Sequence, residues 1–201
     1  MTADPKTIAV YDARAAEYAT LDPSDTPDAN LRAFLAALPA TARVLDLGAG
    51  PGRSARFIAA AGHDVLAVDA SQAMVDLASE QPGVAAQQAS FDDLPDLGMF
   101  DGIWANFSLL HARAEDLPRH LSEIHAALTP KGVFHIALKL GTQDQATTER
   151  DRIGRRYVYL RDSDLMRRLD DAGFTPISER RGRDIGLSGD LSDWIAVLSH
   201  A

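Results

Sequence analysis

Short apolar runs alternate along the chain with segments in which apolar residues recur every three or four positions. An apolar run of about four to eight residues is typical of a buried parallel strand, whereas the longer spacing is typical of a helix with one buried face. Strands joined by helices in this way predict a doubly wound α/β fold with helices on both faces of a mostly parallel sheet. The runs that predict the first five strands are 44–47, 65–68, 84–88, 100–106 and 133–140.

The last part of the chain breaks this alternation. Residues 175–181 and 194–198 have the pattern of strands, and no helical pattern separates them. We therefore expect an antiparallel hairpin at the C-terminus and about seven strands in all. We expect residues 1–201 to form a single α/β domain, in which residues 1–40 are an N-terminal helical cap.

Three polar residues are expected to begin helices. Asp4 precedes Pro5, and Pro is favoured at the first position of a helix. Asp28 and Ser71 each precede a segment with helical spacing, where a side-chain oxygen accepts from a free backbone N–H. These residues predict where three of the helices start.

Three glycines spaced two residues apart follow the first predicted strand, in Asp46-Leu47-Gly48-Ala49-Gly50-Pro51-Gly52. Glycine has no Cβ, so it occurs where the backbone bends tightly or lies against a ligand. An Ala-rich segment comes next and ends at Gly62, the residue type expected at a helix C-terminus. We expect a strand, a tight turn and a helix, with a cofactor against Gly48 and Gly50.

The spacing of these glycines bears on which cofactor the turn binds. The dinucleotide fingerprint G-x-G-x-x-G would require glycine where this chain has Arg53. Asp46 would repel a pyrophosphate and attract a cationic amino group. Asp69 ends the next predicted strand about 20 residues past the turn, where a carboxylate binds ribose hydroxyls. These residues predict a ligand with a ribose and a positive charge.

Four stretches in this order resemble the class I S-adenosylmethionine-dependent methyltransferases, in particular small bacterial-type enzymes that act on small molecules. They are the glycine turn, Asp69-Ala70-Ser71, the strand at 100–106, and residues 128–134 before the fifth strand. The resemblance covers nearly the whole chain. It implies a Rossmann-like domain, S-adenosylmethionine as cofactor, S-adenosylhomocysteine as product, and methyl transfer to a small-molecule acceptor. Two alternatives stay open at this point: a nicotinamide-dependent oxidoreductase and a catalytically silent S-adenosylmethionine-binding protein.

The resemblance also implies which residues hold the cofactor. Residues 11–18 resemble an N-terminal segment that covers the cofactor near its methionine end. Ser90 stands where the family usually has an acidic residue for the adenine amino group, so Asp92 is the alternative partner, and Phe91 is placed to stack on the adenine. The expected cofactor-binding residues are Tyr11, Arg14, Asp46, Gly48, Ala49, Gly50, Asp69, Ala70, Met74, Ser90, Phe91, Ala105 and Asn106.

The loop after the fourth predicted strand lies at the carboxyl edge of the sheet, where open α/β sheets bind their ligands. His111 follows this strand and is the first candidate for a general base, because the ordinary pKa of histidine is near neutral. Tyr157 is the second candidate. For both residues the alternative is that they only form a wall of the pocket.

Residues 141–156 are polar and charged, without helical or strand spacing, and such long loops are often functional lids. We expect this segment and the first helix to cover the acceptor. Its four arginines would favour an acceptor with a carboxylate or phosphate, the alternative being a solvated surface of mixed charge. They are Arg150, Arg152, Arg155 and Arg156.

Composition excludes several classes of function. The chain has 201 residues, a net charge of -9 and no cysteine. The negative charge disfavours nucleic acid and anionic lipid, and the lack of cysteine excludes disulfides, thiolate metal sites and a cysteine nucleophile. His120 and His125 are five residues apart, so we expect both to be solvated rather than metal ligands, and we expect no metal. Without a recognisable signal or membrane-spanning run, the expected location is the cytoplasm, and the oligomeric state is left open.

Overall fold

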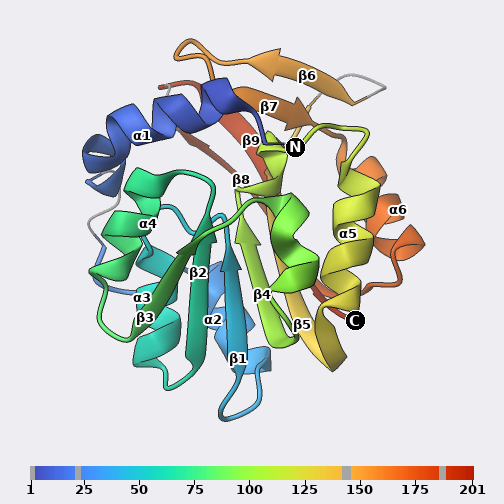
Figure 1. Ribbon diagram of the computed structural model, residues 1–201. Coiled ribbons are helices and arrows are strands. Elements are labelled where there is room, and N and C mark those ends of the chain that lie inside the picture. Colours follow the sequence, from blue (N-terminus) through green and yellow to red (C-terminus); the bar gives the residue numbers. More distant parts are fainter. Residues whose placement is uncertain (1–2, 21–23, 142–145, 186–188) are drawn as a thin grey trace.

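A seven-stranded sheet is the centre of the computed structural model, which describes residues 3–20, 24–141, 146–185 and 189–201. The strand order is β3-β2-β1-β4-β5-β9-β8, with β1 to β5 parallel and β9 antiparallel to both β5 and β8. This confirms the doubly wound sheet and its C-terminal hairpin (Figure 1). The strands of the sheet are β1 Arg43–Leu47, β2 Asp64–Asp69, β3 Val84–Gln88, β4 Phe100–Asn106, β5 Leu128–Lys139, β8 Thr175–Ile185 and β9 Leu191–His200.

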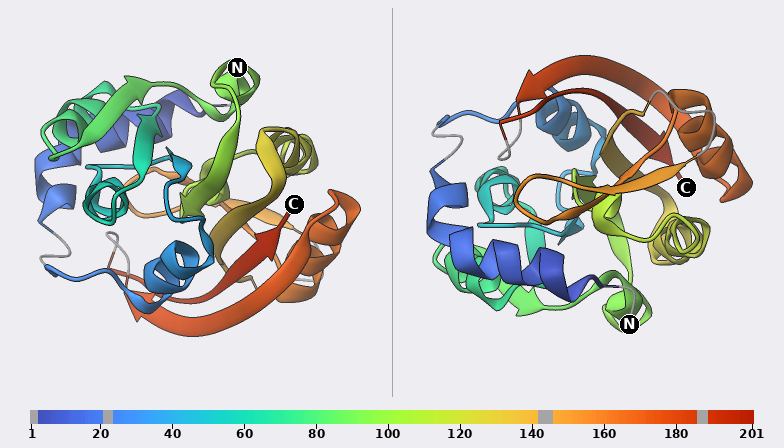
Figure 2. Two further views of the ribbon diagram at one scale, coloured as in Figure 1. Left: turned by 90° about the horizontal axis from the view of Figure 1, so that it is seen from below. Right: turned by 90° about the horizontal axis from the view of Figure 1, so that it is seen from above.

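Helices cover both faces of the sheet and close a hydrophobic core on each (Figure 2). On one face α2 and α3 bury Phe34 and Ile58 against β1 and β4, and on the other α5 and α6 bury Leu121 and Leu169 against β4 and β5. The two faces exist because side chains alternate along each buried strand. The helices are α1 Pro5–Ala19, α2 Ala29–Ala37, α3 Arg53–Ala60, α4 Gln72–Ser79, α5 Leu117–Ala126 and α6 Asp162–Asp171, with short 3₁₀ helices at Phe91–Asp96 and Leu109–His111.

The predicted helix starts are confirmed. The Asp4 carboxylate accepts from the backbone N of Thr7, that of Asp28 accepts from Asn30 and Leu31, and the Ser71 hydroxyl accepts from Met74. Each bond satisfies a backbone N–H that has no partner inside the helix. The first of these helices, α1, begins beside the carboxyl edge of the sheet and runs across it toward α4 (Figure 1).

A second, two-stranded sheet forms in the segment that the sequence pattern assigned to a loop. β6, Thr147–Arg150, pairs antiparallel with β7, Arg156–Tyr159, and the pair lies over the carboxyl edge of the main sheet (Figure 1). The expectation of an irregular loop over 141–156 is thus wrong for this part, while residues 142–145 lie outside the described residues. The four residues of β6 are polar and three of them are exposed, so they carry no apolar strand signal.

The interior of the fold corrects the expectation for one histidine. His120 is wrong as a solvated residue, because its side chain is buried and its ring packs at 5.5 Å from that of Phe91. No group of histidine and acidic side chains suited to a metal ion occurs among the residues with described positions. No helix in that part of the chain is long and apolar enough to cross a membrane. The division into one domain with a cap over residues 1–40 remains a prediction.

Candidate active site

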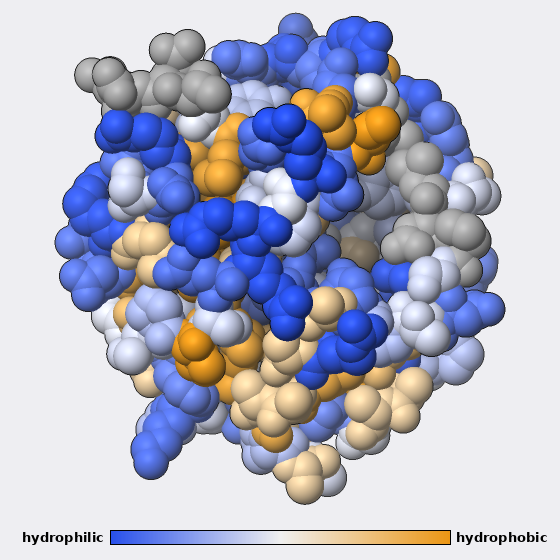
Figure 3. Space-filling view, turned by 180° about the vertical axis from the view of Figure 1, so that it is seen from behind, coloured by the Kyte–Doolittle hydropathy of each residue, from blue (hydrophilic) through white to orange (hydrophobic). Residues whose placement is uncertain are grey.

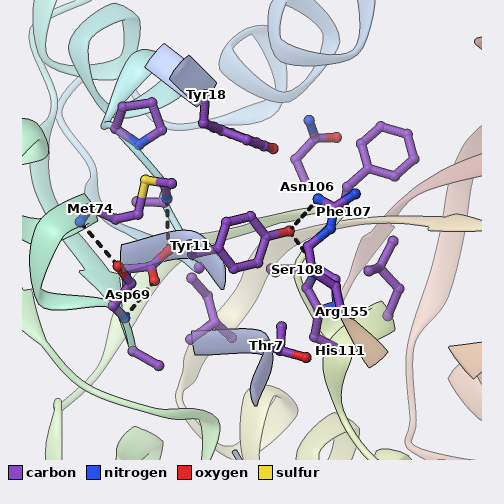
Figure 4. Close-up of a pocket in the computed structure, with 18 of the residues that line it drawn as sticks. Thr7, Tyr11, Tyr18, Asp69, Met74, Asn106, Phe107, Ser108, His111 and Arg155 are labelled. Atoms are coloured by element: carbon purple, nitrogen blue, oxygen red, sulfur yellow. Dashed lines mark hydrogen bonds between the residues drawn. The ribbon is translucent and has the colours of Figure 1, made fainter. Parts of the chain in front are cut away.

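A cavity of about 590 Å³ opens at the carboxyl edge of the sheet, under α1 and β7. Its size is in the range of pockets that hold a small ligand or cofactor. Tyr11 crosses it, with Asp69 and Met74 on one side and His111 and Arg155 on the other (Figure 4). The face seen in Figure 3 is mostly polar and has a recess to the right of its centre.

The glycine turn forms the floor of this cavity and fits tightly against the loop after β4. Gly48 has φ +77°, and a Cβ built on it would lie 2.3 Å from Cβ of Ser108. The backbone N–H groups of Gly48 and Ala49 both donate to the carbonyl of Val68 on β2. Glycine is needed here for two reasons, the left-handed backbone and the close approach of Ser108.

Asp46 is the penultimate residue of the buried strand β1, just before the turn, and is 2% exposed. One side of the carboxylate accepts from the backbone of Ala55, whereas Oδ2 has no hydrogen-bond partner among the described residues. Burial raises the pKa of Asp46 to about 7, because the ionised form has lost its water. A buried, unpaired oxygen on the wall of a cavity is the feature that a cationic amino group would satisfy.

Asp69 is held by the backbone of the two loops that surround it. Its Oδ2 accepts from the N–H of Gly50 at 2.9 Å, and its Oδ1 accepts from the N–H of Ser71 at 2.9 Å. Burial raises the pKa of Asp69, and these backbone donors work in the opposite direction. Each oxygen keeps a lone pair for a further donor, such as a hydroxyl of a ligand.

The next wall of the cavity is formed by Met74, Ser90 and Phe91. The N–H and the hydroxyl of Ser90 both donate to Asp93, so the hydroxyl oxygen still has the capacity to accept a hydrogen bond. Asp92, the alternative that the sequence left open, does not line the cavity, and its carboxylate pairs with Arg119 at 2.7 Å. Between these two residues, the structure places only Ser90 at the cavity.

His111 and Tyr11 are hydrogen-bonded to each other at the end of the cavity that lies away from Asp69 and Met74. The ring Nδ1 of His111 lies 2.5 Å from the carbonyl of Arg156, which requires that Nδ1 carry the proton. Its Nε2 then accepts from the hydroxyl of Tyr11 at 2.7 Å (Figure 4). Burial lowers the pKa of His111 to about 4, so the ring is neutral at pH 7. The near-neutral pKa that the sequence argument assumed for His111 is therefore wrong.

Tyr157 lines the cavity beside this pair, with its ring centroid 4.8 Å from that of His111. Burial raises the pKa of Tyr157 above its ordinary value, so the phenol keeps its proton near neutral pH. Tyr157 is therefore placed as a hydrogen-bond donor or an aromatic wall and is poorly suited to act as a base.

Several bonds fasten α1 to the β6–β7 hairpin above the cavity. Asp4 pairs with Arg150 at 2.8 Å, the Thr7 hydroxyl accepts from the N–H of Arg156, and Arg155 donates to the Tyr11 hydroxyl at 3.0 Å. Arg155 is itself held by a buried ion pair with Asp151 at 2.8 Å. The two segments that cover the cavity are thus joined to each other.

Eleven of the thirteen expected cofactor residues line the cavity, as do His111 and Tyr157. Arg14 and Ala105 do not. Arg14 pairs instead with Glu17 on the surface of α1, and Ala105 is buried in the core because it points to the opposite face of β4 from Asn106. Sequence reasoning missed three lining residues that lie on strands, Trp104, Lys139 and Trp194, and one in the loop after β4, Ser108.

Several known proteins to which this chain is similar are described as methyltransferases. A family model described as a methyltransferase domain matches residues 44–132. Magnesium-protoporphyrin O-methyltransferase of Rhodobacter capsulatus is 37% identical over 102 residues, which are 48% of this chain and 46% of that protein, so the match spans about half of each. An uncharacterized methyltransferase of Staphylococcus carnosus is 27% identical over 167 residues, 80% of this chain and 79% of that one.

Solved structures extend the similarity to nearly the whole chain. The 1,6-didemethyltoxoflavin-N1-methyltransferase of Burkholderia thailandensis, with bound 1,6-didemethyltoxoflavin and S-adenosylhomocysteine, is 26% identical with a TM-score of 0.68. That alignment covers 96% of this chain and 87% of that one. The CcbJ methyltransferase of Streptomyces caelestis is 20% identical with a TM-score of 0.73 over 98% of this chain and 99% of that one, and it supports the fold alone.

Proposed function

We propose that this chain is a class I S-adenosylmethionine-dependent methyltransferase, and that it transfers a methyl group to a small-molecule acceptor bound under α1 and the β6–β7 hairpin. The methyltransferase-domain match and the 26% identical methyltransferase structure support this proposal. The cofactor is S-adenosylmethionine, so the nicotinamide alternative is set aside. The observation that carries the proposal is the set of residues that line the cavity. The cavity runs from the cofactor residues to a second group of residues beneath the cover, which include His111, Lys139 and Tyr157.

The residues on the glycine side fit this cofactor. We assign Asp46 to its amino group, because the free Oδ2 is buried and would gain a cationic partner. We assign Asp69 to the ribose hydroxyls, since its two oxygens are already aimed by Gly50 and Ser71. Met74, Ser90 and Phe91 would then lie along the adenine.

When bound, the cofactor supplies an electrophilic methyl group on a sulfonium. What the chain itself must do is hold the acceptor in line with that methyl group and keep water out. The cover made by α1 and β7 suits the exclusion of water, because hydrogen bonds and ion pairs already join the two segments. Phe107, Leu110 and Trp194 give the acceptor end of the cavity apolar walls.

The Tyr11–His111 pair suits an acceptor that loses a proton. A proton released by the acceptor would go to the Tyr11 oxygen while the Tyr11 proton goes to Nε2 of His111, so the charge ends on the imidazole. The low pKa of His111 keeps the imidazole neutral before the reaction, and the neutral ring is the form that can accept this proton. We therefore assign the pair to proton transfer and not to nucleophilic attack.

The experiment that tests the proposal uses S-adenosylmethionine labelled in its methyl group and three separated fractions of a bacterial extract: small molecules, nucleic acid and protein. Label should appear in a small-molecule product, and boiled enzyme is the control. Transfer of label only to nucleic acid or only to protein would contradict a small-molecule acceptor.

A further inference from the structure

Lys139 places a cation at the acceptor end of the cavity. It is the last residue of β5, at the carboxyl edge of the sheet, and its side chain lines the cavity. Its ammonium lies 4.7 Å from the centroid of the Tyr157 ring, and its neighbour across the β5–β9 pairing is Trp194. The cation is therefore flanked by aromatic walls.

No carboxylate among the described residues lies within ion-pair distance of this ammonium. The acidic side chains in this region have other partners. Asp151 pairs with Arg155, Asp190 pairs with Arg152, and Asp184 accepts from Nε1 of Trp194. Burial and then the repulsion of Arg155 lower the pKa of Lys139, while the more distant charges of Asp151 and Asp190 act in the opposite direction.

The arginines that the sequence offered for an anionic acceptor are committed to the protein itself. Arg150 pairs with Asp4, Arg155 with Asp151, and Arg156 donates to the carbonyl of His111. These contacts build the cover over the cavity. Lys139 is thus a basic residue of the cavity that has no ion-pair partner among the described residues.

We propose that Lys139 binds an anionic group of the methyl acceptor, and that the substrates are small organic acids with a flat apolar body. The anion, a carboxylate or a phosphate, would pair with the ammonium, and the apolar body would lie against Phe107 and Trp194, whose rings meet edge to face at 6.2 Å. This inference rests on the proposed function, since it takes the same cavity to be the acceptor site.

The test measures the binding of simple probes to protein saturated with S-adenosylhomocysteine. Ligand-observed NMR compares benzoate and phenyl phosphate with the neutral compounds benzamide and benzyl alcohol. The wild-type protein should bind at least one anion about tenfold tighter than the neutral compounds, as expected for a charge-assisted bond. Lys139→Met should remove this preference, and Lys139→Arg should keep part of it. The control is Lys6→Met, since Lys6 is exposed on α1 and does not line the cavity.

The outcomes separate this inference from the function on which it rests. S-adenosylhomocysteine binding is measured first in every variant, and its absence in the wild-type protein would overturn the proposed function and this inference with it. If S-adenosylhomocysteine binds but no probe does, or if neutral probes bind as well as anions, only the role of Lys139 is overturned. A preference for anions that survives in Lys139→Met has the same consequence. Whichever of benzoate and phenyl phosphate binds tighter identifies the kind of anion.

Discussion

The hydroxyl of Tyr11 lies 2.7 Å from Nε2 of His111, across 100 residues of sequence. This bond joins the first helix to the loop after β4 at the centre of the cavity. A second hydrogen bond, from Nδ1 of His111 to the carbonyl of Arg156, fixes the tautomer of the ring and leaves Nε2 to accept from Tyr11. The two bonds therefore connect the cover of the cavity, its polar interior and the β7 strand.

We predict that Tyr11→Phe lowers product formation about a hundredfold, as expected for loss of a group that moves a proton. The buried Nε2 of His111 would also lose its donor, which should lower the free energy of unfolding by about 1–3 kcal/mol. Labelled-product assays and denaturant titration measure the two effects. Tyr159→Phe is the control, because Tyr159 stacks on Tyr157 outside the cavity lining. Equal activity of the two variants would remove Tyr11 from the proton path.

The raised pKa of Asp46 predicts a pH dependence of cofactor binding. Below about pH 7 the free protein carries a proton on this carboxyl, and pairing with a cationic amino group would release it. Affinity for S-adenosylhomocysteine should therefore rise by up to about tenfold per pH unit below 7 and level off above it. Calorimetry in two buffers of different ionisation enthalpy counts the released proton. Asp46→Asn should bind more weakly with no such dependence. Proton release that is unchanged in Asp46→Asn would assign the titration to another group.

The same shift has a consequence for stability. The folded-state pKa of Asp46 lies above its unfolded value, so the unfolded chain ionises first as pH rises. The ligand-free protein should therefore lose stability between about pH 4 and pH 7. Asp46→Asn should lose less over that interval in thermal unfolding. A variant with the same slope as the wild type would show that Asp46 ionises freely in the folded protein.

Gly48→Ala should destabilise the protein and abolish cofactor binding, because the new Cβ would meet Ser108 at 2.3 Å. Gly62→Ala separates the two causes, since Gly62 also has a positive φ, +92°, but has nothing within 4 Å of a built Cβ. In the Gly62→Ala control, backbone strain alone should lower the free energy of unfolding by about 1–3 kcal/mol, and S-adenosylhomocysteine should bind normally. Similar losses in both variants would mean that the approach of Ser108 is unimportant.

Hydrogen exchange tests whether α1 and the β6–β7 hairpin act together as a cover. S-adenosylhomocysteine should slow exchange in residues 5–19 and 156–159 while leaving α6 unchanged. Arg150→Met removes the ion pair with Asp4 and should speed exchange at the start of α1. Arg167→Met, which breaks a surface pair with Asp171 on α6, should not. Unchanged exchange in α1 on ligand binding would contradict the cover.

The sequence predicted the residues of the cavity best where neighbouring elements carry the signal in a fixed spacing. Asp46, Gly48 and Asp69 belong to a strand, a turn and a strand whose spacing is visible along the chain, and all three line the cavity. The prediction that Arg14 binds the cofactor was wrong because its guanidinium donates instead to the carboxylate of Glu17, three residues further along the same helix. The prediction for Ala105 was wrong because successive side chains on a strand point to opposite faces of the sheet, so Ala105 points away from the cavity that Asn106 lines.

Contacts between distant segments were not predictable in this way. The charges of residues 150–156 resembled an open basic site, but their partners Asp4 and His111 lie on other elements, and pairing of that kind leaves no local pattern. β6 was missed because its exposed residues lack an apolar repeat. Lys139 had a usable signal, since it ends a strand that was predicted at nearly this position, and strand ends are where such sheets bind ligands.

The central claim is that the cavity at Asp46 and Asp69 holds S-adenosylmethionine, and calorimetric titration tests it most directly. The wild-type protein should bind one S-adenosylhomocysteine per chain and show no heat with NADH. Asp69→Asn should bind about a hundredfold more weakly, because it replaces a charge-assisted pair of bonds to the ribose. Asp64→Asn, at the exposed start of β2, should bind like the wild type. Binding of NADH with no response to S-adenosylhomocysteine, or equal affinity in Asp69→Asn and the wild type, would contradict the account.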